Sequence, residues 1–305
     1  MYESDPVVFA HDGEVLAIRT LALTLFFETG TVDRVALGVM ASEAIGLVAP
    51  HARWMRFDEM TRNKWIDTAL LQTGMAFVKD SLLARADGVL IIDSGSTIGG
   101  VGQWSFQYVD TPSEEGEVLG SVQLHMPICS AEGPIAADKA ADALLRLALR
   151  WTGEVNFFHG YGGLSVNYDQ GDINARRDMA LRGHAERYLG FNLSDLVTER
   201  RGLLAQLKNA QWLTFLGNAM LSYNPVHAEL LWAWPGSLTT AQGLLLRAGE
   251  RPEAGDVHRG EDLPALRELN EMLQPWLVDN LFPMPGFFPD EEAVRRWLHS
   301  LRPHD

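Results

Sequence analysis

Cysteine is almost absent from this chain, because Cys129 is the only one among 305 residues. A single cysteine can form neither an intrachain disulfide nor a zinc cluster, which points to a reducing compartment, most simply the cytoplasm. The surrounding segment, PICSAEG, has no residue pattern that would activate a thiol. We therefore interpret Cys129 as a structural or incidental residue.

Long hydrophobic runs are also lacking. The longest candidate, LALTLFF, is the size of a strand and falls short of the roughly 18 apolar residues that cross a bilayer. The first residues, MYESDPVVFAHDGE, contain acids where a signal peptide would have a basic segment followed by an apolar one. We expect neither a membrane-spanning helix nor export.

Basic residues are few. The chain has 25 Lys and Arg against 40 Asp and Glu, a formal net charge of −15, and no basic run longer than two arginines. This charge repels nucleic acid phosphates and anionic lipid surfaces and favours a basic partner. Solubility alone would also explain it.

Motifs for catalysis, cofactors or metals are missing as well. The glycine-rich segments GSTIGGVG and HGYGGLS match no phosphate-binding pattern, and Ser165 lies outside any G-x-S-x-G sequence. The nine histidines are scattered without metal-ligand spacing. The sequence therefore predicts no catalytic residues, no metal site and no cofactor.

Hydrophobic periodicity indicates a mixture of strands and helices. We expect strands at 15–30, 53–57, 88–93, 154–168 (broken by GYGG), 211–217, 229–234 and 243–249, and a half-buried hairpin at 104–126. We expect helices at 31–50, 62–83, 136–151, 174–190, 194–208, 218–223, 263–277 and 290–302. Thr31 can cap the first helix, and Val32, Val35, Val39 and Met40 follow at helical spacing.

This order is neither an alternating βαβ pattern nor all β. It predicts the α+β class, with a mixed, largely antiparallel sheet covered by helices. No linker interrupts residues 1–305, so we expect one domain. A soft boundary near 190–210 could separate two lobes of similar size.

The densest polar stretch is LLLRAGERPEAGDVHRGEDLP, residues 244–264. Asp256, His258 and Arg259 could form a small acid/base group. However, Pro252 and the glycines mark successive turns, and carboxylates next to arginines in such a loop commonly bind the loop to itself. We interpret it as a rigid structural loop between a strand and a helix.

The same stretch resembles a family of type VI secretion immunity proteins, the TsiV-like proteins that neutralise VRR-type nuclease effectors. The similarity is carried by an RAG-x-x-P-x-x-GD segment followed by a helix that ends in L-x-P, and by the segments QWLTFLG and HGYGGLSVN. The matching residues are Arg247, Ala248, Gly249, Pro252, Gly255, Asp256, Leu273 and Pro275, then Trp212, Leu213 and Gly217, and finally Gly160, Tyr161, Gly162 and Gly163.

The chain departs from the pattern at three positions. His258 stands where the family pattern has Asn, Ala265 where it has an aromatic residue, and Trp276 where it has Arg. These departures argue against membership of the central subgroup of the family, and hence bear on which effector is bound.

The resemblance implies a non-enzymatic inhibitor in the cytoplasm of the toxin-producing cell, with a cognate effector protein as its partner and no binding to nucleic acid or membrane. An acidic surface can occupy the cationic cleft of a nuclease. The candidate partner-binding residues are Glu114, Glu115, Glu117, Glu253, Asp256, Glu261 and Asp262.

Two alternatives stay open. One is a hydrolase or transferase whose site is assembled from distant residues around the 244–264 loop, namely Asp256, His258 and Glu250 together with the GYGG segment. The other is an adaptor of the secretion system that binds several partners weakly.

Overall fold

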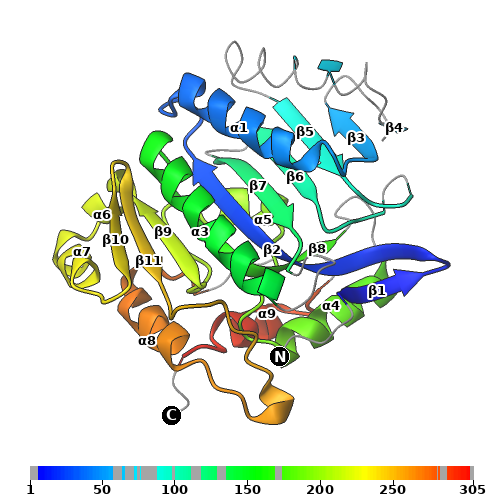
Figure 1. Ribbon diagram of the computed structural model, residues 1–305. Coiled ribbons are helices and arrows are strands. Elements are labelled where there is room, and N and C mark those ends of the chain that lie inside the picture. Colours follow the sequence, from blue (N-terminus) through cyan, green and yellow to red (C-terminus); the bar gives the residue numbers. More distant parts are fainter. Residues whose placement is uncertain are drawn as a thin grey trace.

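Eleven strands join into one sheet in the computed structural model (Figure 1), in the order β10-β11-β9-β8-β2-β7-β6-β5-β3-β4, with β1 added beside β2. Every described strand pair is antiparallel. The structure describes residues 6–57, 64–65, 72–73, 76, 88–97, 100–110, 118–128, 135–168, 174–279, 281 and 287–302. The predicted α+β class, with a largely antiparallel sheet, is confirmed.

The elements alternate irregularly along the chain. The strands are β1 Val7–His11, β2 Glu14–Phe27, β3 Trp54–Phe57, β4 Lys64–Trp65, β5 Gly88–Asp93, β6 Ser105–Asp110, β7 Gly120–Met126, β8 His159–Tyr168, β9 Leu213–Gly217, β10 Ser237–Thr240 and β11 Gly243–Arg247. The helices are α1 Arg34–Val48, α3 Ile135–Glu154, α4 Ala175–Arg187, α5 Leu196–Gly202, α6 Asn218–Ser222, α7 Pro225–Trp232, α8 Pro264–Met272 and α9 Glu291–Leu298.

Strand β2 is the centre of the sheet. It pairs with β7 on one side and with β8 along ten residues on the other. Its leucines at 21, 23 and 25 and its threonines at 20 and 24 point to opposite faces, and both sets are buried. The central strand predicted at 15–30 is therefore confirmed.

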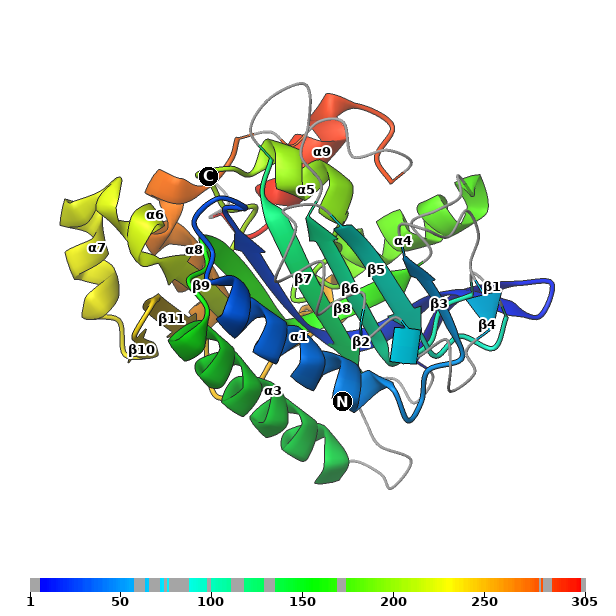
Figure 2. The ribbon, with the colours of Figure 1, turned by 90° about the horizontal axis from the view of Figure 1, so that it is seen from above.

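Helices cover both faces of this sheet. Figure 2 shows α1 and α3 on one face and α4, α5 and α9 on the other. Helix α1 is capped by Asp33, whose carboxylate accepts from the amides of Val35 and Ala36, and not by Thr31 as predicted. The predicted helix is confirmed. Of the apolar residues at helical spacing, Val32 and Met40 are buried, whereas Val35 and Val39 are exposed.

Two predicted strands differ in detail. The hairpin is confirmed as β6 and β7, but the side chains of both strands are mostly buried on both faces, because helices cover each side. Strand β8 runs without a break through GYGG. Its glycines allow a close approach to β2: a Cβ at Gly160 would overlap the carbonyl oxygen of Thr24.

The segment ELLWAW was predicted as a strand and is part of helix α7 instead. Pro225 occupies the first turn of this helix, where its fixed φ suits a helix start. Ala228 and Leu231 then bury one side at i, i+3 spacing. The prediction missed this signal, together with the short strands β1 and β10.

The helix predicted at 62–83 lies largely outside the described residues, and of its first part Lys64–Trp65 forms strand β4. Strands from before residue 190 and after residue 210 belong to the same sheet, because β8 pairs with β9.

Candidate functional site

The loop that follows β11 is fixed to α4 by Asp256. Its carboxylate accepts two hydrogen bonds from Arg187, at 3.0 and 2.7 Å, and one from the backbone amide of His258 at 3.0 Å. The arginine holds the pKa of Asp256 at about 2. At neutral pH the carboxylate is therefore charged and holds the loop to α4.

Glycine conformations fix the path of the same loop. Gly255 has a φ of 63°, and a Cβ there would lie 2.6 Å from Leu263. Farther back in the loop, Arg251 pairs with Asp138 and Asp142 of α3. The interpretation of residues 244–264 as a structural loop agrees with these contacts.

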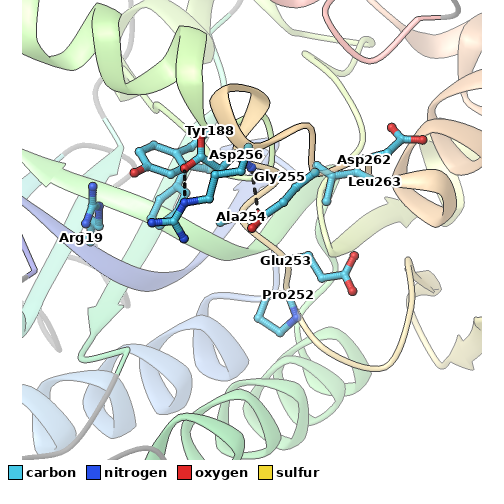
Figure 3. Close-up of a pocket in the computed structure, with 12 residues that line it drawn as sticks. Arg19, Tyr188, Pro252, Glu253, Ala254, Gly255, Asp256, Asp262 and Leu263 are labelled. Carbon is cyan, nitrogen blue, oxygen red and sulfur yellow. Dashed lines mark hydrogen bonds and ion pairs between the residues drawn. The ribbon is translucent and has the colours of Figure 1, made fainter. Parts of the chain in front are cut away.

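A cleft of about 350 Å³ lies between this loop and the sheet (Figure 3). Arg19 projects into it from β2, stacked over Tyr188 at 5.1 Å and donating through Nε to Nε2 of His184 at 3.0 Å. Burial, together with the nearby guanidinium of Arg19, lowers the pKa of His184 to about 3. At neutral pH this histidine is an uncharged acceptor that orients Arg19.

The cleft does not gather the acid/base group considered from the sequence. The Asp256 carboxylate is already hydrogen-bonded to Arg187, and both His258 and Glu250 are exposed. The GYGG residues lie inside the sheet as part of β8. Among the described residues that line the cleft, none comes from GYGG. The Asp256 carboxylate therefore neutralises Arg187, and the residues proposed as an acid/base group do not come together in the cleft.

The predicted partner-binding residues have different environments. Glu253, Glu261 and Asp262 are exposed at the rim of the cleft, and the carboxylates of Glu253 and Asp262 point away from Arg19 in Figure 3. Asp256, in contrast, is only 3% exposed, so the exposure expected for it is not observed. The hairpin-tip residues Glu114, Glu115 and Glu117 lie outside the described residues.

Two buried acidic groups that sequence reasoning did not single out are structural. Asp93 accepts from the amides of Gly95 and Gly102 and from Asn167, and burial raises its pKa to about 7. Gly95 and Gly102 of the glycine-rich segment thus bind a carboxylate of their own chain. The second group, Glu199, pairs with Lys208 at 2.6 Å, both side chains being fully buried.

No group of three His, Cys, Asp or Glu side chains in the described part of the chain is placed to hold a metal ion. Likewise, no helix among these residues is long and apolar enough to cross a membrane.

The comparison with protein families decides what this fold belongs to. The model of TsiV, described as type VI immunity for VRR-NUC, matches residues 48–301. The chain belongs to the TsiV family. The match contains all three segments on which the resemblance was based, and it confirms a resemblance over most of the chain.

A solved structure is similar to this TsiV family member over nearly its whole length. The T6SS protein PA0821 of Pseudomonas aeruginosa superposes with a TM-score of 0.76 at 18% sequence identity, covering 98% of this chain and 88% of that chain. At this identity the likeness shows the fold. No curated protein matches the chain.

Proposed function

We propose that this TsiV family member is an immunity protein that binds a cognate type VI toxin with a VRR-NUC nuclease domain and blocks its substrate cleft. The observation that carries the proposal is the family match over residues 48–301. We further propose that it acts in the cytoplasm of the toxin-producing cell and catalyses no reaction itself.

The charge of the chain supports this mechanism. A nuclease cleft is cationic because it holds phosphates. A protein with a net charge of −15 has the same sign as the nucleic acid substrate, so it can compete for this cleft and associate quickly by electrostatic steering. The inhibitor therefore needs rigid acidic and apolar contacts and no catalytic group.

The test begins with the flanking genes, because the proposal predicts that one of them encodes a toxin with a VRR-NUC domain. The purified chain should form a tight complex with the isolated VRR-NUC domain and abolish its cleavage of DNA, with a nuclease of unrelated fold as the control. Deletion of the gene should sensitise cells to attack by siblings that carry the toxin. Cleavage that continues at saturating concentrations of this chain would reject the proposal.

A further inference from the structure

Helix α7 and the turn before it, which contains Tyr223, expose large apolar side chains. Tyr223, Val226, Leu230 and Trp232 are exposed by 65, 72, 58 and 42%, and they are four of the nine large hydrophobic side chains exposed among the described residues. Val226 and Leu230 are one helical turn apart, on the same side of α7, whereas Trp232 lies on another side of the helix. We call these four residues the α7 surface. Large apolar side chains exposed on neighbouring residues are a feature of protein interfaces.

A cleft of about 360 Å³ adjoins the α7 surface through Tyr223. Its apolar walls come from Leu119, Phe158 and Leu204, and the Tyr223 ring lies 6.2 Å from the ring of Phe158. Glu28, at the end of β2, is the acidic residue that lines it. The cleft therefore combines an aromatic ring, aliphatic walls and one carboxylate.

Glu28 lacks a cationic partner among the described residues, unlike three of the buried carboxylates. Asp110 pairs with Arg34, Glu199 with Lys208 and Asp256 with Arg187. Glu28 accepts a hydrogen bond from the Thr31 hydroxyl at 3.1 Å, and within the described ranges no basic side chain forms an ion pair with it. A cation supplied by another molecule would give the Glu28 carboxylate an ion-pair partner.

We propose that the α7 surface and this cleft are the site where the nuclease toxin docks, with an Arg or Lys of the toxin inserted into the cleft. The aliphatic stem would lie along Leu119 and Leu204, and the cation would meet Glu28 and the face of Tyr223. Apolar side chains of the toxin would cover Val226, Leu230 and Trp232. This inference rests on the proposed function and names the surface that it uses.

Charge distinguishes the toxin from a second copy of this chain. Between residues 203 and 246 the only Lys or Arg is Lys208, which is 1% exposed and bound to Glu199. A symmetric dimer through α7 would therefore bring no cation from this segment to Glu28. It would also bring together two molecules that each carry a net charge of −15. A cationic protein with an apolar patch would supply the cation for Glu28 and cover the apolar side chains of the α7 surface.

The experiment measures the dissociation constant of the complex with the purified VRR-NUC domain for four variants. Leu230→Arg places a charge in the α7 surface, and Glu28→Gln removes only the charge in the cleft. Met179→Arg and Glu186→Gln are the same substitutions on α4, at the opposite end of the molecule (Figure 1), where Met179 is 69% exposed and Glu186 is paired with Arg182. Unfolding curves of all four variants should match the wild type.

We expect Leu230→Arg to weaken binding by about 30-fold or more and Glu28→Gln by about tenfold, with both α4 variants within about twofold of wild type. If the wild type binds and all four variants bind equally well, the docking surface is wrong while the function stands. If the wild type does not bind the nuclease, both proposals fall. A wild-type dimer that Leu230→Arg converts to monomers would assign the surface to self-association and overturn the inference.

Discussion

At the scale of single residues, the acidic loop shows why charge in a sequence does not report exposure. Asp256 was grouped with Glu253, Glu261 and Asp262, but it alone is buried and bound to Arg187. The glycines and proline around it predicted turns correctly. The partner arginine is 69 positions away, so no local pattern could identify it.

Asp256→Asn should destabilise the fold in a pH-dependent way. The pKa of Asp256 is lowered from 3.8 to about 2, so its ionised form stabilises the folded state above the unfolded pKa. That contribution is lost as the pH falls through the folded pKa. Urea unfolding should show the wild type to be more stable at neutral pH, with the gap closing from about pH 5 to about pH 2. A gap that is independent of pH would contradict the ion pair.

The buried pair of Glu199 and Lys208 gives a second prediction at this scale. Glu199 also accepts from the hydroxyls of Tyr161 at 2.8 Å and Ser194 at 3.0 Å. Lys208→Met removes the cation and leaves a buried carboxylate unneutralised, which should cost about 3–5 kcal/mol of unfolding free energy.

Its control is the double variant Lys208→Met with Glu199→Gln, which leaves no buried charge. We expect it to be more stable than Lys208→Met alone in the same denaturation measurement. Equal stability of the single and double variants would show that the lost charge pairing is not the cause.

At the scale of elements, long periodic segments were predictable and short ones were not. The spacing of apolar residues predicted β2 and α3, because each has enough residues to show its period. The segment ELLWAW has too few residues to distinguish a strand from a helix. Its true state depended on Pro225 and on a core contact at Leu231. This error also hid the α7 surface, which is visible only once the segment is known to be helical.

Two glycines should respond in opposite directions to substitution by alanine. In β8, Gly160→Ala would force a methyl group against the backbone of Thr24, so we expect a loss of about 1–3 kcal/mol or more. In α4, Gly183 has open space around it, and Gly183→Ala should gain up to about 1 kcal/mol from helix propensity. Thermal unfolding compares the two. Similar effects of both changes would contradict the close packing of β8 on β2.

At the scale of the whole molecule, one sheet joins the segments on either side of residues 190–210. Leu213 and Thr214 of β9 pair directly with Gly162 and Tyr161 of β8. We therefore expect a single cooperative unfolding transition, in which the calorimetric and van't Hoff enthalpies agree. Two resolved transitions would instead support two lobes that unfold separately.

The net charge of −15 makes its own prediction for the proposed complex. Steering by opposite charges acts before contact, so added salt should slow association with the VRR-NUC domain, by about tenfold or more between low and high ionic strength. Dissociation depends on contacts that are already shielded from water, such as those proposed at the α7 surface, and should change little. Stopped-flow mixing measures both rates.

The surface proposal then separates the two variants: Leu230→Arg should mainly speed dissociation, whereas Glu28→Gln should reduce the salt dependence only slightly, because it removes one of many charges. An association rate that is independent of salt would show that the acidic surface does not guide this protein to its partner.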